Sequence, residues 1–214
     1  MSTSTRWTIV VVAAVAVLIA ALVVQLGHDP AAELSAPAGG TSADRTHRDA
    51  DTPANLAEPR RRADLEPCPV GAAAGPPELR GVAVECAADG AYVAVAPALA
   101  GRPVVLNLWA YWCGPCAQEL PAMAEYQRRV GRDVLVVTVH QDENETAALL
   151  RLAELGVHLP TFQDGQRKIA AALRVPNVMP ATVLLRADGT VAQILPRAFA
   201  SADEIAAAVQ DGLG

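Results

Sequence analysis

The chain has 214 residues, which is more than one ordinary domain of about 100 to 150 residues requires, so we expect further segments beside the domain. Its formal charge is −6, from 17 basic and 23 acidic residues. No basic patch of the kind that binds nucleic acid is present, and we therefore expect no nucleic-acid partner. The four cysteines fall into two pairs, 68/86 and 113/116. In an exported protein an even count permits one catalytic and one structural disulfide.

The N-terminal region contains a long apolar run. Residues 7–26 are twenty residues without a formal charge, and a helix of that length spans about 30 Å, the thickness of a bilayer core. We predict a transmembrane anchor over 7–26 and a cytoplasmic tail over 1–6. Cleavage as a signal peptide near Ala31 or Ala32 is the alternative. With Arg6 before the run, the positive-inside rule predicts a single-pass protein of the cell membrane whose C-terminal domain is extracytoplasmic.

Residues 27–65 show no sustained apolar period and mix proline, glycine and charged residues. Such a composition cannot offset its ordering entropy by burial, so it predicts a flexible linker. The three arginines at 60–62 could contact anionic lipid head groups, but the end of a solvated linker is the interpretation we favour.

A β-hairpin extension is predicted over residues 66–96. Two short strand patterns, 81–86 and 91–95, flank an Asp-Gly pair at 89–90, which favours a tight turn. Cys68 and Cys86 enclose 17 residues, a loop for which a disulfide contributes about 3 kcal/mol. We favour a structural disulfide. A redox relay to the second cysteine pair and two free buried thiols are the alternatives.

Residues 97–214 alternate between apolar strand patterns and helical patterns. The expected strands are 104–109, 134–139, 159–162, 178–185 and 191–195, and the expected helices are 113–131, 146–155, 166–173 and 202–213. Strand–helix–strand units imply parallel pairing with right-handed crossovers, and an Asp-Gly turn at 188–189 implies a final antiparallel hairpin. The pattern therefore predicts an α/β fold with a central mixed sheet flanked by helices.

A CxxC motif lies between the first of these strands and its helix, in the stretch Trp112-Cys113-Gly114-Pro115-Cys116. Two thiols three positions apart can close a small disulfide, and the first lies where a helix N-terminus stabilises a thiolate. This is the chemistry of dithiol–disulfide exchange. We expect no cofactor beyond this redox-active disulfide and no metal, because no second cysteine or histidine pair completes a zinc site. A Cu(I)-binding metallochaperone using both cysteines and Met179 is the alternative from another class.

The CxxC motif, a Met-Pro-Ala-Thr strand start at 179–182 and the Asp-Gly hairpin after it resemble the thioredoxin fold. Three further features resemble the membrane-anchored TlpA/ResA-like thiol–disulfide oxidoreductases more closely than cytoplasmic thioredoxin. They are Asn107, the Glu119-Leu120-Pro121 sequence, and an inserted helix and short strand over 143–165. The resemblance covers about residues 97–212, and the cysteine-bearing hairpin before it resembles an actinobacterial elaboration.

The resemblance implies roles for the cysteines and for residues beside them. Cys113 is expected to attack and Cys116 to resolve the mixed disulfide. Glu119 is the candidate for exchanging a proton with Cys116, because Asn107 stands where classical thioredoxins have a buried aspartate. A solvated helix glutamate is the alternative for Glu119.

The resemblance also implies a substrate-binding surface. Pro180 is expected to be a cis-proline beside the active site, and Trp112, Pro115 and Met179 to line the surface that binds client proteins. We expect His140 and His158, by contrast, to be loop or surface histidines.

The implied function is that of a membrane-tethered reductase of envelope protein disulfides, with cytochrome c biogenesis as one setting. Its partners would be protein thiol or disulfide clients and a membrane electron donor or acceptor of the CcdA/DsbD-like kind. A disulfide oxidase for exported proteins is the alternative within the same class, because Gly114 and Pro115 alone do not set the direction of electron flow.

Overall fold

A computed structural model describes residues 51–213 of the chain. The predicted tail at 1–6, the anchor at 7–26 and the linker up to residue 50 lie outside the described residues. Over 51–213, no helix is both long enough and apolar enough to span a bilayer.

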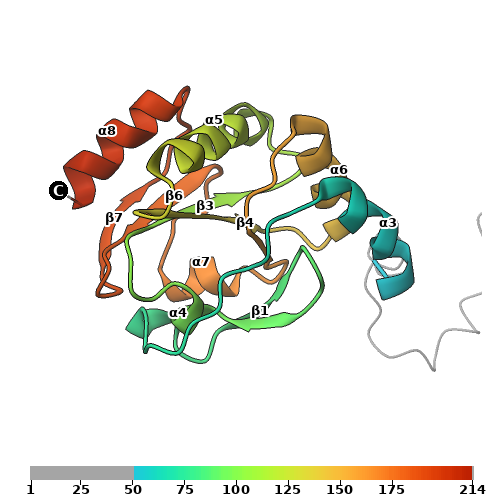
Figure 1. The fold of residues 1–214 in the computed structure, drawn as a ribbon, viewed down its shortest axis with the longest axis horizontal. Helices are drawn as coiled ribbons and strands as arrows, with labels where there is room; N and C mark the ends of the chain where they lie inside the picture. The colour runs from blue at the N-terminus through green and yellow to red at the C-terminus, as the bar shows by residue number, and fades with distance from the viewer. Residues whose placement is uncertain (1–50, 214) are drawn as a thin grey trace, which may run out of the picture. The chain divides into compact units, whose positions relative to one another are not determined.

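The described region is built on one mixed sheet whose strands follow the order β2-β1-β5-β4-β3-β6-β7 (Figure 1). The strands are β1 (Ala83–Cys86), β2 (Tyr92–Ala94), β3 (Val104–Trp109), β4 (Leu135–His140), β5 (Thr161–Gln163), β6 (Ala181–Leu185) and β7 (Val191–Leu195). Strands β3, β4 and β5 run parallel to one another. The pairs β3–β6, β6–β7, β1–β5 and β1–β2 are antiparallel. The predicted α/β fold with a mixed sheet is confirmed.

Helices cover both faces of this sheet. They are α3 (Pro53–Ala63), α4 (Val95–Ala98), α5 (Gly114–Val130), α6 (Glu145–Leu155), α7 (Lys168–Ala172) and α8 (Ala202–Leu213), with a 3₁₀ turn at Pro77–Leu79. In Figure 1, α5 and α8 lie together on one side of the sheet, and α4 and α7 lie on the other.

Two apolar cores, one on each face, follow from the alternation of side chains along β3. Leu106 and Leu108 belong to the core that includes Ile169 of α7, and Val105 and Trp109 belong to the core that includes Leu120 of α5. Successive side chains of a strand point to opposite faces, so a strand buried on both faces is apolar at nearly every position; in β3 Asn107 is the polar exception. Every residue of β3 is buried, as the continuous apolar run predicts.

The segment at 83–94 forms an antiparallel hairpin that continues the main sheet. Ala83 pairs with Ala94 across the hairpin, and Cys86 pairs with Phe162 of β5. A disulfide joins Cys86 to Cys68, which lies in the segment leading to the hairpin. The bridge therefore fastens the entry of the chain to the edge of the sheet.

The prediction of a flexible linker over 27–65 is wrong for residues 53–63, which form α3. Thr52 caps the helix by accepting the Asn55 N–H, and Pro53 stands at its first turn, where proline is tolerated. Leu56 and Ala63 are buried in a small core with Leu149 of α6. The helix is stabilised by this tertiary packing, which a local search for apolar periodicity does not reveal.

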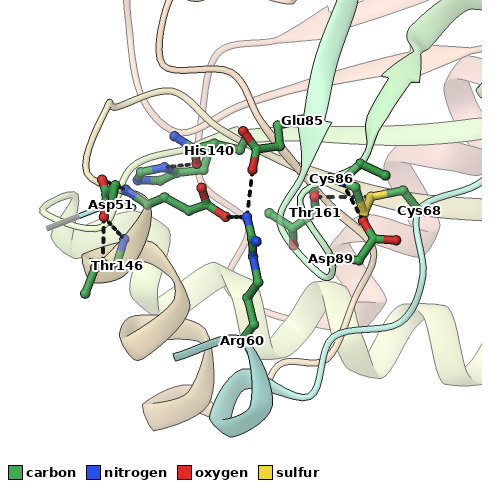
Figure 2. A network of polar contacts seen from close by, with 12 residues as sticks. Asp51, Arg60, Cys68, Glu85, Cys86, Asp89, His140, Thr146 and Thr161 are labelled. Carbon is green, nitrogen blue, oxygen red and sulfur yellow. Dashed lines mark hydrogen bonds and ion pairs between the residues drawn. A yellow bond between two sulfur atoms is a disulfide. The ribbon is translucent and has the colours of Figure 1, made fainter. Parts of the chain in front are cut away.

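Polar contacts fasten α3 to α6 and β1 as well (Figure 2). Asp51 accepts hydrogen bonds from the backbone N–H groups of Glu145 and Thr146, at 2.9 and 3.0 Å. Arg60 lies between two carboxylates, 2.7 Å from Glu85 and 2.9 Å from Glu145. The prediction that 60–62 form a solvated linker end is therefore wrong for Arg60, which is largely buried in this ion-pair cluster.

Candidate active site

The two cysteines of the CxxC motif lie where β3 passes into α5. Cys113 is the N-cap of α5, and its Sγ accepts the Cys116 backbone N–H at 3.2 Å. The two sulfurs are joined in a disulfide. Cys113 retains 5% of its surface exposed, whereas Cys116 is fully buried. An incoming group can therefore reach the pair only at Cys113, at a helix N-terminus that favours negative charge on sulfur.

The surface beside Cys113 carries an exposed indole. Trp112 is 57% exposed, and its Nε1 donates to Asp142 Oδ2 at 3.0 Å. Asp142 in turn accepts the N–H of Asn144, the residue that caps α6. The loop between β4 and α6 thus holds the Trp112 ring in place while leaving its apolar surface open.

Met179 and Pro180 lie directly before β6. The peptide bond between them is cis, as the family resemblance implies. Ala181, the next residue, pairs with Leu108 of β3, so Pro180 is level with the end of the strand that leads to the motif. Met179 packs against the apolar core that contains Cys113 and Cys116. The sheet register therefore brings this loop to the disulfide.

Glu119 is a buried carboxyl group on α5. It lies three positions after Cys116, so the two side chains are neighbours on one helix face. Asn107 Nδ2 donates to its Oε2 at 2.8 Å, and the Phe199 N–H donates to its Oε1 at 3.1 Å. Burial raises the pKa of Glu119 to about 7, although both donors and the charge of Arg197 act in the opposite direction. The alternative of a solvated helix glutamate is wrong.

Asn107 holds Glu119 from the neighbouring strand. Its Nδ2 is also 3.3 Å from Thr182 Oγ1 on β6, while its Oδ1 is buried without a hydrogen-bond partner. A buried unpaired carbonyl is costly. Rotating the amide by half a turn would place Oδ1 against Glu119, where it can accept the proton of a neutral carboxylic acid. The amide therefore suits both protonation states of Glu119.

His140 is a positioning residue that the sequence interpretation missed. The prediction of a loop or surface histidine is wrong for it, because His140 ends β4 fully buried with its ring 4.9 Å from Trp109. Its Nδ1 pairs with Gln163 Oε1 at 2.8 Å, and its Nε2 accepts the Tyr111 N–H at 3.4 Å. Burial lowers the pKa of His140 to about 4, so it is neutral near pH 7. It fixes the backbone two residues before Cys113.

Comparison with known proteins places the chain in a family. Residues 69–205, which contain the CxxC motif, Glu119 and Pro180, match the Redoxin family. The chain belongs to the Redoxin family. The thiol-disulfide oxidoreductase ResA of Bacillus subtilis is 33% identical over 98 residues, covering 45% of this chain and 54% of that protein. Thioredoxin 1 of Synechococcus elongatus is 36% identical over 86 residues, covering 38% of this chain and 77% of that protein.

Solved structures show the same fold. The structure of dsbF from MTB superimposes with a TM-score of 0.57 at 23% identity, covering 64% of this chain and 98% of that one. A DsbF homologue from Corynebacterium diphtheriae gives a TM-score of 0.53 at 25% identity, covering 67% of this chain and 85% of that one. The Redoxin region therefore has a thioredoxin-like fold. The chain spans about half the length of the ResA proteins that it matches.

The second disulfide of this Redoxin chain stands apart from the first. Cys86 pairs with Phe162, Phe162 with Val139, and Val139 with Leu108. Neighbouring strands are about 4.8 Å apart, so Cys86 lies about 14 Å across the sheet from the strand that leads to Cys113. This separation rules out direct exchange between the two pairs in this fold, and it agrees with a structural bridge.

Within residues 51–213, no group of three or more histidine, cysteine or acidic side chains is arranged to hold a metal ion. Both active-site sulfurs are bonded to each other in this state. His158 is exposed and its Nδ1 contacts the Ala63 carbonyl oxygen at 2.9 Å, which agrees with the prediction of a surface histidine.

Proposed function

We propose that this protein is a membrane-tethered, extracytoplasmic thiol–disulfide oxidoreductase that reduces disulfides of envelope proteins through Cys113 and Cys116. The observation that carries the proposal is the asymmetry of the pair. Cys113 alone retains exposed surface, at a helix N-terminus, and Cys116 is buried next to a carboxyl group whose pKa is about 7. The similarity to ResA supports the same activity.

The reaction begins with the reduced dithiol. The Cys113 thiolate attacks one sulfur of a client disulfide, forming a mixed disulfide and releasing the other client sulfur as a thiolate. Cys116 then attacks Cys113 Sγ, which closes the disulfide in this fold and releases the second client sulfur. Two electrons pass to the client, and the enzyme pair is oxidised.

Glu119 accepts the proton that Cys116 must lose before it attacks. A buried thiol has no access to water, so its proton needs a carrier whose pKa is near the operating pH. The pKa of Glu119, about 7, meets that requirement. The Asn107 amide rotates when Glu119 gains or loses a proton, so Glu119 keeps a hydrogen bond to Asn107 in both protonation states.

The client binds across the surface formed by Trp112, Pro115 and the Met179–Pro180 loop. Trp112 and Val178 are apolar side chains that are 57% and 45% exposed. Trp112 precedes Cys113, and Val178 lies two residues before Pro180. An extended peptide placed here brings its disulfide to Cys113, and apolar contact with the indole supplies binding area. Met179, which packs against the core of the cysteines, sets how closely the client sulfur approaches.

The setting of the reaction follows from the predicted anchor at 7–26, with 27–50 as the connection to the described region. Outside the membrane, the oxidised enzyme must be reduced again, and a membrane electron donor of the CcdA/DsbD-like kind would do this. Apocytochrome c is one client with this chemistry. The Cys68–Cys86 bridge supports an oxidising compartment.

Two single-cysteine variants test this function. We expect Cys113→Ser to abolish reduction of a disulfide substrate such as insulin. Cys116→Ser should accumulate a mixed disulfide between Cys113 and the client, because the resolving thiol is missing. Non-reducing electrophoresis and mass spectrometry measure the adduct. Adducts that form equally well in Cys113→Ser would contradict the assignment of the nucleophile.

The midpoint potential of the Cys113/Cys116 couple decides the direction of electron flow. A value near −270 mV, as for thioredoxin, is expected for a reductase. A value near about −120 mV, as for the strong oxidant DsbA, would identify a disulfide oxidase instead and overturn the reductase proposal.

A further inference from the structure

The connection between β7 and α8, residues 196–201, reaches back to the active site. Phe199 in this connection is 2% exposed and belongs to the same apolar core as Cys113 and Cys116. Its backbone N–H donates to Glu119 Oε1 at 3.1 Å. One of the two donors that hold this carboxyl group therefore comes from a loop eighty positions along the chain.

Arg197 lies over this contact. Its guanidinium carbon is 4.2 Å from the centre of the Phe199 ring, a distance that gives a cation–π attraction. The positive charge of Arg197 also lowers the pKa of Glu119, against the larger effect of burial. Arg197 thus acts on Glu119 by two routes, through the position of the Phe199 backbone and through its charge.

The loop is fastened at the start of α8. The Glu204 N–H donates to Ser201 Oγ, and Glu204 Oε2 accepts the Ala200 N–H at 3.0 Å, one residue before the position used in a standard capping box. Glu204 Oε2 is also 3.7 Å from Arg197 Nη1, with the two side chains 49% and 52% exposed. Arg197 Nη1 also donates to the Ala198 carbonyl oxygen at 3.3 Å. These two contacts hold the guanidinium beside the Phe199 ring.

We propose that Arg197 is a positioning residue for Glu119. Its guanidinium stacks on the Phe199 ring and thereby keeps the Phe199 N–H on the Glu119 carboxylate. The proposal deepens the proposed function, since it assigns what sets the proton affinity at the buried cysteine. The two groups that donate hydrogen bonds to Glu119 are uncharged: the Asn107 amide, with Thr182 behind it, and the Phe199 N–H. Cys116, three positions before Glu119 on α5, is disulfide-bonded. Among the described residues, Arg197 is the charged group that acts on Glu119.

The test is a direct titration of Glu119 in the oxidised full-length protein. Carbon-13 labelling of the glutamate carboxyl carbons gives an NMR resonance for Glu119, assigned by its loss in Glu119→Gln. We expect the titration midpoint to rise in Arg197→Gln by less than about one pH unit, because a half-exposed charge is screened by solvent. Arg197→Lys keeps the charge and should shift the midpoint less.

Glu204→Gln is the matched control. Glutamine can still accept the Ala200 N–H, so the contacts at the start of α8 are kept while the ion pair with Arg197 is removed. The Glu119 midpoint should stay within error of the wild type or fall slightly. A midpoint that does not move in Arg197→Gln would overturn the proposal. A midpoint that rises as much in Arg197→Lys would support the stacking of the guanidinium on Phe199 as the route, because lysine keeps the charge.

The titration separates this proposal from the proposed function, because it is measured without any client. In an exchange assay, the pH at which the resolving step becomes fast should rise in Arg197→Gln together with the NMR midpoint. If the protein had no exchange activity, the NMR shift would still be observed. If Arg197→Gln changed the pH at which the resolving step becomes fast but left the NMR midpoint of Glu119 unchanged, the role proposed for Arg197 would be overturned.

Discussion

Two buried carboxyl groups in this molecule have the same raised proton affinity and different surroundings. Burial raises the pKa of both Glu119 and Glu145 to about 7. Glu119 is held by two uncharged donors, the Asn107 amide and the Phe199 N–H. Glu145 is held by Arg60, whose guanidinium it shares with Glu85 (Figure 2). A raised pKa alone therefore does not distinguish a proton carrier from a structural group.

The hydrogen-bond and ion-pair partners of Glu119 and Glu145 distinguish the proton carrier from the structural group. Uncharged donors allow Glu119 to gain or lose a proton without leaving another charge unpaired, and the Asn107 amide can serve either state. When Glu145 takes up a proton, Arg60 keeps only Glu85 as a counter-charge, so the protonation of Glu145 is coupled to the ion pairs of Arg60 and not to the cysteines. We infer that Glu145 belongs to a structural clamp, which we define as Arg60 on α3 with its partners Glu145 on α6 and Glu85 on β1. Of the two carboxyl groups compared, Glu119 belongs to the chemistry.

The largest effect is expected from breaking the clamp. Arg60→Ala leaves Glu85 and Glu145 close together without a cation, and losing one partner of a buried ion pair costs about 3 to 5 kcal/mol. Denaturant unfolding measures the loss. Arg61→Ala is the matched control, because Arg61 is on the same helix but exposed with Glu58, and it should cost less than about 1 kcal/mol. Equal losses in the two variants would show that the burial of Arg60 contributes nothing.

The next effect is on activity. Glu119→Gln keeps the size and a hydrogen-bonding carbonyl but cannot accept a proton, so the resolving step should slow by about 100-fold at pH 8, the usual scale for one general base. In the wild type, this rate should rise with pH through about 7, the pKa of Glu119. The variant should lack that rise. Stopped-flow measurement of release from the mixed disulfide checks it.

Glu145→Gln is the control for this activity prediction. It removes a buried carboxyl group of similar pKa from a site that does not touch the cysteines. The wild-type pH dependence should be retained. If Glu145→Gln removes the rise and Glu119→Gln does not, the roles inferred for the two groups are wrong.

The sequence predicted the active site better than it predicted the clamp, for a physical reason. Short local patterns identify the active-site residues: the CxxC motif for Cys113 and Cys116, and the strand start for Pro180. Within each pattern, neighbouring residues determine the local backbone geometry. Glu119 required the family resemblance, because only the fold shows that its helix face is buried. Its second donor, the Phe199 N–H, is eighty positions away, so no local pattern reveals it.

The sequence did not predict that Arg60 and His140 are buried, because the partners that allow their burial are distant in sequence. Arg60 is a charged residue in a polar segment. Its burial is made tolerable by ion pairs with Glu85 and Glu145, which lie 25 and 85 positions along the chain. His140 ends an apolar strand, where a solvent-facing ring is a reasonable expectation. Gln163 and the Tyr111 N–H satisfy both ring nitrogens and so allow a neutral imidazole in the core.

The smallest effect is expected in the pH dependence of stability. The folded-state pKa of Glu145, about 7, lies above its ordinary value of 4.5, so the folded protein holds a proton that the unfolded chain releases between these values. Its contribution to stability is fully present below about pH 4.5 and is lost as the pH rises through about 7. In Glu145→Gln, the fall in unfolding free energy between pH 5 and 8 should shrink, on the order of 1 kcal/mol. Thermal unfolding over that range measures it. A fall that is unchanged or steeper in the variant would mean that Glu145 is ionised over this pH range, and the contrast with Glu119 would then be one of charge as well as of partners.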